Sequence, residues 1–268
     1  MGKVIKFQSV LWICLFSAAF FGCSGNAFEG ISDDDSFEAR LEEARMNIDD
    51  EQYREAINIL SDLKAEQPNN EDVTSYLSNA HAGLAGLNTF DLLEVIDDLD
   101  EAGNSGSIDM VGLVLGDSDG LVVAEEVPDK LDNLNEAIDQ LNTIEDPTDD
   151  QIVQMGLLSV SRIGMTLAKI IFSDTGNTSL TLTEEGIQSE YDTKPEFEDG
   201  DVSDEDLENL TNDIQNVGEA VDAITESYGY DNDLNEDFLE FKNDFDQNAD
   251  DTIDIQELEN YIESLLND

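Results

Sequence analysis

Apolar residues recur every three or four positions along most of the chain after residue 36, and this spacing places them on one face of an α-helix. Two such faces follow each other before Pro68. The first consists of Leu41, Ala44 and Ile48, and the second of Tyr53, Ala56, Ile57, Leu60 and Leu63. Pro68, Asn69 and Asn70 are residues typical of turns. The pattern therefore predicts a pair of helices that ends at Pro68.

Helical spacing returns in three longer segments. The first contains Leu131, Leu134, Ile138 and Leu141, and the last contains Leu207, Leu210, Ile214, Val217, Val221 and Ile224. Ser203, followed three residues on by Asp206, predicts the start of the last helix. The middle segment, residues 149–172, is apolar on most sides but contains Arg162 and Lys169. Because charged residues are costly inside a membrane, we expect a buried central helix there rather than a membrane span.

Strand-like alternation is scarce in this sequence. Residues 179–183 alternate polar and apolar, as a strand does. Residues 103–126 contain glycines between short apolar pieces and predict an irregular insertion. The predicted fold class is all-α, with helical hairpins packed against further long helices and a helix-loop-helix at the end.

The chain begins with the layout of a secretory signal peptide. Lys3 and Lys6 precede an apolar run over residues 10–21, which is followed by Gly22 and Cys23. The run is shorter than the roughly 20 apolar residues that a transmembrane helix needs. We therefore expect residues 1–22 to direct export and then to be removed.

The stretch Phe20-Phe21-Gly22-Cys23-Ser24 resembles the lipobox of bacterial lipoproteins, although that family usually has Leu where this chain has Phe20. The resemblance implies that Cys23 carries the lipid, that the protein is held on a membrane of the cell envelope, and that Ser24 directs it to the outer membrane. Residues 23–36 are rich in small and polar residues and predict a flexible tether. The alternative is cleavage after Ala27, which would give a secreted or periplasmic soluble protein.

Charge restricts the possible partners. The 268 residues include 65 Asp and Glu but 11 Lys and Arg, which gives a net charge of −54. The negative electrostatic potential of such a chain repels nucleic acid and attracts divalent cations and basic partners. Adaptation to a saline habitat, where a charged surface keeps a protein soluble, explains the same composition equally well.

Residues 37–102 resemble tetratricopeptide repeats, which are helical hairpins of 34 residues. With Pro68 at the terminal proline of the first repeat, Phe37 takes its first position, and Ala44, Ala56 and Leu60 take its small, small and large packing positions. A second unit begins at Glu71 and has Leu77, Ser78, Ala80 and His81 where the family has Leu, Gly, Ala and Tyr, followed by a helix over residues 90–99. The resemblance implies a surface that binds another protein. Residues 103–228 are then a helical domain that caps the hairpins, since stacked repeats need about three units.

Residues 246–257 resemble the 12-residue calcium loop of an EF-hand. The resemblance implies that calcium is the bound cofactor and assigns a ligand to most of the oxygen-bearing positions. The implied ligands are the side chains of Asp246, Asn248 and Asp250, the backbone carbonyl of Thr252, both carboxylate oxygens of Glu257, and Asp254 directly or through a water. Asp251 stands at the sixth position, where the family has a glycine of positive φ, and Ile253 is the β-branched residue of the eighth.

The flanks of this loop predict a helix on either side, so that residues 229–268 form an EF-hand-like helix-loop-helix. The flanking apolar residues are Phe238, Phe241 and Phe245 before the loop, and Leu258, Tyr261, Ile262 and Leu265 after it. Residues 231–242 begin like another loop but end on Lys242, and residues 115–126 begin on Leu115, so we expect one site. Extracellular calcium is near millimolar, which fills even weak sites and favours a structural role for the ion.

Enzyme signatures are missing from the sequence, which has one histidine, no free thiol once Cys23 carries a lipid, and no known nucleophile or nucleotide motif. We therefore expect a protein that is not an enzyme. The predicted function is a membrane-anchored, calcium-binding helical scaffold that binds another envelope protein or a basic peptide. The alternatives are a calcium-responsive regulator that exposes its phenylalanines, and an accessory component of an envelope transport or secretion assembly.

Overall fold

The computed structural model describes residues 36–87, 121–182, 184–191, 193–198, 200–228 and 233–265. Of these residues 71% are helical and 4% are in strands, so the chain is mostly helical, as predicted. Several predictions lie outside the described residues: the signal peptide, the lipid on Cys23, the tether up to residue 35, the helix over residues 90–99 and most of the insertion.

By its internal contacts the chain divides after Arg40 into two units. Of the first unit, residues 36–40 are described, and they form the first turn of helix α2 (Phe37–Asp49). The hydroxyl of Ser36 accepts a hydrogen bond from the N–H of Ala39 at 3.2 Å, as a helix-capping serine does. The other described elements belong to the second unit, residues 41–268.

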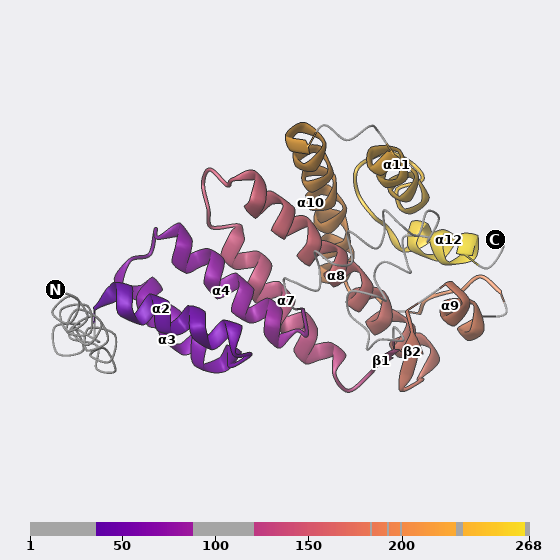
Figure 1. Ribbon diagram of the computed structural model, residues 1–268. Helices are drawn as coiled ribbons and strands as arrows, with labels where there is room; N and C mark the ends of the chain where they lie inside the picture. Colours follow the sequence, from indigo (N-terminus) through magenta and orange to yellow (C-terminus); the bar gives the residue numbers. More distant parts are fainter. Residues whose placement is uncertain are drawn as a thin grey trace, which may run out of the picture. The chain divides into compact units, whose positions relative to one another are not determined.

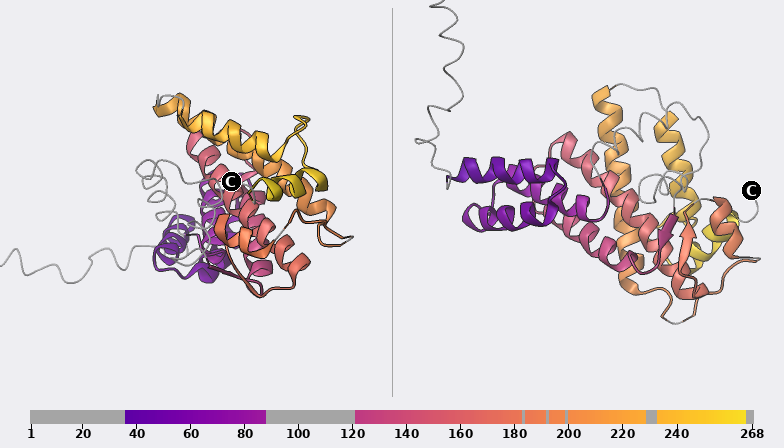
Figure 2. Two further views of the ribbon diagram at one scale, coloured as in Figure 1. Left: turned by 90° about the vertical axis from the view of Figure 1, so that its right-hand side faces the viewer. Right: turned by 60° about the horizontal axis from the view of Figure 1, so that its bottom comes forward.

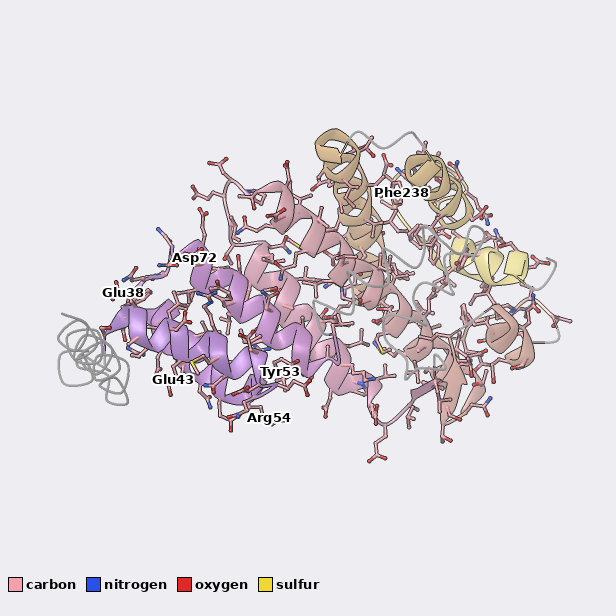
Figure 3. All side chains as sticks on the ribbon, viewed as in Figure 1. Glu38, Glu43, Tyr53, Arg54, Asp72 and Phe238 are labelled. Carbon is pink, nitrogen blue, oxygen red and sulfur yellow. The ribbon has the colours of Figure 1, made fainter. Side chains whose placement is uncertain are left out.

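Helices α3 (Tyr53–Glu66) and α4 (Glu71–Leu84) lie side by side (Figure 1). The turn between them ends at Asn70, whose side chain accepts the N–H of Val73 at 3.1 Å and so caps α4. Tyr53, labelled in Figure 3, lies against Gly83 of α4, where an added Cβ would stand 2.2 Å from the tyrosine ring. Glycine at this position therefore allows the close approach of the two helices.

Helix α8 (Asp149–Thr175) is the centre of the second unit. It packs against α7 (Val127–Leu141) and, along much of its length, against α10 (Asp204–Tyr228) (Figures 1 and 2). Among the described residues it is the one helix long and apolar enough to cross a membrane, but 78% of its most apolar stretch is buried inside the protein. The prediction of a buried central helix is therefore confirmed.

A buried ion pair explains how this apolar helix accommodates Arg162. The guanidinium donates to both carboxylate oxygens of Asp213 on α10, at 2.8 and 2.9 Å, and to the side-chain oxygen of Asn135 on α7 at 2.9 Å. Arg162 is 5% exposed and Asp213 is fully buried. Because a buried charge is tolerated only when it is paired, these bonds fix how α7, α8 and α10 lie against one another.

The start of α10 is the capping box predicted at Ser203 and Asp206. The hydroxyl of Ser203 accepts the N–H of Asp206 at 3.2 Å, and the Asp206 carboxylate accepts the N–H of Ser203 at 3.0 Å. The same carboxylate binds the ammonium of Lys169 on α8 at 2.7 and 3.0 Å. Burial raises the pKa of Asp206, but the bonds from Lys169 and Ser203 outweigh it and hold the pKa below its ordinary value.

This lowered pKa predicts a loss of stability in acid. The contribution of Asp206 is present above the ordinary carboxyl pKa of about 3.9 and is lost as the pH falls through the lower pKa of the folded state. We expect the free energy of unfolding, measured in urea, to fall by about 1 kcal/mol more between pH 6 and pH 2 in the parent than in Asp206→Asn. Asp222→Asn, at an exposed position of α10, should follow the parent. If the free energy of unfolding depended on pH in the same way in the parent and in Asp206→Asn, this role of Asp206 would be contradicted.

A two-stranded antiparallel sheet lies at one end of α8. Strand β1 (Leu121–Val123) pairs with β2 (Ser179–Thr181), with Val122 opposite Leu180, and both of these side chains are buried. Residues 179–181 of the stretch that alternates like a strand therefore form one, and its partner comes from the last part of the segment predicted to be irregular. The short helix α9 (Glu184–Glu190) follows and was not predicted.

Helices α11 (Asp233–Phe245) and α12 (Ile255–Leu265) form the C-terminal pair. Helix α11 packs against α10, where the ring of Phe238, labelled in Figure 3, lies over Gly218. Helix α12 packs against α11 through Phe245 and Tyr261, whose ring centroids are 3.8 Å apart. The helix-loop-helix order predicted for this end of the chain is thus present among the described residues.

Candidate metal centre

The loop between α11 and α12 turns sharply twice. Its first residue, Asp246, continues the hydrogen bonding of α11 by donating its N–H to the carbonyl of Lys242 at 2.7 Å. Ala249 and Asp251 then adopt positive φ values of 57° and 62°. Positive φ is rare for residues other than glycine, and Asp is among those that adopt it more readily. The turn that the EF-hand resemblance places at Asp251 is therefore present without a glycine.

The carboxylate of Asp246 points into this turn. One of its oxygens accepts the N–H of Asp250 at 3.1 Å, and the other accepts the N–H of Asp251 at 3.0 Å. The residue is 3% exposed. A buried carboxylate that binds two successive backbone N–H groups holds the first half of the loop around itself.

Glu257 closes the second half of the loop from α12 and is 4% exposed. Its two oxygens accept the N–H groups of Asn248 at 3.0 Å and of Asp254 at 3.2 Å. Asp254 in turn accepts the N–H of Glu257 at 2.9 Å, so the two residues form a capping box at the start of α12. Glu257 thus links the beginning of the loop to its end.

The remaining predicted ligands lie at the surface. Asn248, Asp250, Thr252 and Asp254 are exposed. Asp250 accepts hydrogen bonds from the N–H and the hydroxyl of Thr252, at 3.1 and 2.6 Å, and these bonds lower its pKa. Within the described ranges, no three carboxylate, histidine or cysteine side chains converge as a metal cluster. Of the six predicted ligands, Asp246 and Glu257 are buried and the other four are exposed to solvent.

The donor chemistry of the loop fits calcium. Each oxygen of the two buried carboxylates accepts one backbone hydrogen bond and keeps a second lone-pair direction, and carboxylate and carbonyl oxygens are the ligands that calcium prefers. In the described part of the chain, the one ion pair of the loop joins Lys242 to Asp251 at 2.6 Å, so Asp246 and Glu257 have no cationic partner. The residues that would hold the ion are Asp246, Asn248, Asp250, Thr252, Asp254 and Glu257.

Comparison of the chain with protein-family models, curated proteins and solved structures found no match.

Two residues of α10 contact the loop and were not foreseen from the sequence. The N–H of Ile253 donates to the hydroxyl oxygen of Thr211 at 2.9 Å, and the side-chain amide of Gln215 reaches the carbonyl of Asp251 at 3.5 Å. Thr211 is 42 positions from Ile253 in the chain. No local pattern in the sequence indicates a pairing at such a distance.

His81 lies on α4, away from this loop in the chain. Its Nδ1 is 3.2 Å from the side-chain oxygen of Asn133 on α7, and the side chain is partly buried. The contact joins α4 to α7.

Proposed function

We propose that the protein is a calcium-binding helical scaffold of the bacterial cell envelope, anchored to the membrane through a lipid on Cys23, which binds another envelope protein or a basic peptide. The observation that carries the calcium part is the placement of Asp246 and Glu257. These two buried carboxylates organise the two halves of one loop through backbone N–H groups and have no cationic partner among the described residues.

A bound cation would offset the mutual repulsion of the acidic side chains in the loop. Five of the twelve positions from 246 to 257 are Asp or Glu: Asp246, Asp250, Asp251, Asp254 and Glu257. Repulsion among negative charges this close together raises the energy of the folded state unless a positive charge is near. A calcium ion supplies two positive charges at once. We therefore assign the ion a structural role, in which it keeps α11 and α12 packed together.

The scaffold part of the proposal rests on the helices α2 to α4. The residues at the repeat-like packing positions are buried: Ala44, Ala56, Leu60, Leu77, Ser78 and Ala80. Carboxylates occupy the exposed sides of the same helices, and Glu43 and Asp72 are examples labelled in Figure 3. Complementary charge steers association and selects partners, so a basic peptide is the class of ligand that this surface favours.

Calcium titration by calorimetry tests the metal site. We expect one stoichiometric site in the purified protein, and a loss of affinity of about 100-fold or more in Asp246→Asn and in Glu257→Gln, because each variant removes a charged ligand. Asp222→Asn and Glu208→Gln make the same changes at exposed positions of α10 and should bind as the parent does.

The titration also distinguishes the proposal from its alternatives. Weak binding at many sites that the loop variants leave unchanged would contradict a calcium loop and indicate a diffuse acidic surface. A large rise in exposed apolar surface when calcium is added, measured by binding of a fluorescent dye, would favour a calcium-responsive regulator over a scaffold.

The lipid anchor requires a separate measurement. Mass spectrometry of the protein purified from bacterial membranes should find the mature chain beginning at a lipid-modified Cys23. A soluble product that begins at Phe28 would instead show cleavage after Ala27.

A further inference from the structure

Helix α10 holds the candidate calcium loop through one of its faces. Thr211 and Gln215 are four residues apart, which places them on the same side of the helix, next to the buried Ile214. Thr211 accepts the N–H of Ile253 at 2.9 Å, and Gln215 approaches the carbonyl of Asp251 at 3.5 Å. The shorter of the two contacts has the geometry of a full hydrogen bond.

The bond to Thr211 lies at the middle of the loop. Ile253 stands between Asp250, whose N–H binds Asp246, and Asp254, whose N–H binds Glu257. Its side chain is 5% exposed. An N–H that loses its acceptor inside a protein costs free energy, so the hydroxyl of Thr211 stabilises the loop in this form.

Helix α10 is itself held firmly against the core. Asp213, two residues after Thr211, forms the buried pair with Arg162 of α8. One side of the helix further along approaches α8 so closely that a Cβ on Gly156 would stand 2.3 Å from the Cβ of Ala220. A hydrogen-bonding group on such an element has a fixed position from which the loop can be aligned.

We propose that Thr211 is a positioning residue of the calcium site: by accepting the N–H of Ile253, its hydroxyl holds the two halves of the loop in the arrangement that the ion requires. The inference rests on the proposed calcium function. It adds a residue outside the loop, on a helix of the core, to the set that determines calcium affinity.

The test compares three substitutions on α10 in the full-length protein purified in detergent. Thr211→Val keeps the shape of the side chain and removes the acceptor, whereas Thr211→Ser keeps the acceptor. Thr225→Val is the matched control, because the hydroxyl of Thr225 donates to the carbonyl of Val221 on its own helix at 2.8 Å. Calcium affinity is measured by calorimetry, and exchange of the Ile253 amide proton by NMR in calcium-free protein.

We expect Thr211→Val to weaken calcium binding about threefold to tenfold and to speed exchange of the Ile253 amide by a similar factor or more. Thr211→Ser and Thr225→Val should stay within about twofold of the parent in both measurements. A purely structural role would lower the melting temperature of Thr211→Val and leave the calcium affinity unchanged.

Calcium affinity in Thr211→Val equal to that of the parent would overturn the inference, even if the Ile253 amide exchanged faster. Absence of calcium binding in the parent would instead overturn the proposed function, and the positioning role with it. Should Thr211→Val fail to fold, Thr211→Ala provides the same comparison, since alanine also lacks the acceptor and favours a helix.

Discussion

Replacing the buried Arg162 by methionine is expected to lower the free energy of unfolding by about 3–5 kcal/mol at pH 8. The substitution keeps a long apolar side chain but leaves the fully buried carboxylate of Asp213 without its counter-charge. It also removes the donor to Asn135 on α7. Urea unfolding followed by circular dichroism measures the change. Arg45→Met, which breaks an exposed pair with Glu42, should cost less than about 1 kcal/mol.

The loss in Arg162→Met should depend on pH. Burial raises the pKa of Asp213 to about 6, against the opposing effect of Arg162, so the carboxylate is ionised and paired at neutral pH. Without the guanidinium only the hydrogen bond from Ser159 opposes the effect of burial, and the pKa of Asp213 rises further. A raised pKa means that the folded state binds a proton more tightly than the unfolded state, so stability is lost as the pH rises. The deficit of the variant should therefore be smaller at pH 5 than at pH 8.

A double substitution separates the unpaired charge from lost packing. Replacing a whole buried ion pair by apolar residues is often neutral, so Arg162→Met with Asp213→Leu should recover most of the stability that Arg162→Met alone loses. If the double variant were as unstable as the single one, and the deficit were equal at pH 5 and pH 8, the loss would come from packing and the electrostatic account would be wrong.

Phe245→Ala is expected to cost about 3–5 kcal/mol, because it removes a fully buried ring from the contact between α11 and α12. The ring lies 5.1 Å from that of Phe241 and 3.8 Å from that of Tyr261, measured between centroids. Phe245→Leu keeps much of the volume and should cost less than about 2 kcal/mol. Urea unfolding measures both changes.

Phe245 also directly precedes the first predicted ligand, Asp246. Loss of the ring contact frees the end of α11, so calcium affinity should fall in Phe245→Ala, although no ligand is changed. Equal stability of the alanine and leucine variants would contradict a packing role for the ring. Calcium affinity that is unchanged in Phe245→Ala would show that the loop holds its form without the aromatic contact.

Helices were the part of this fold that the sequence predicted well. The two helices predicted before Pro68 are present as α2 and α3, and α10 begins at Ser203 and Asp206, as predicted. Both predictions depend on residues within a few positions of one another, where helical periodicity and capping act. The strand-like alternation from residue 179 was recognised for the same reason and is present over residues 179–181, but β1 became identifiable only through its pairing with β2.

For the candidate site, the order of oxygen-bearing residues from Asp246 to Glu257 was visible in the sequence, as was the turn at Asp251. The sequence did not indicate that Asp246 and Glu257 are buried while Asn248 and Asp250 are exposed. It also gave no indication of the contact from Thr211. Burial depends on which neighbouring elements cover each side chain, and that information is not local.

The charged residues of α8 show both what the local sequence determines and what only tertiary contacts determine. From the sequence alone, Arg162 and Lys169 in an apolar segment predict a buried helix rather than a membrane span, because a charge is costly in lipid. Their partners, Asp213 and Asp206, lie on α10, 51 and 37 positions away. Local periodicity determined the helices of this protein and the order of its candidate ligands. Only the tertiary structure decided which charges pair and which carboxylates are buried. The cost of burying a charge is offset by a partner of opposite charge, and that partner is distant in the sequence and lies near only after folding.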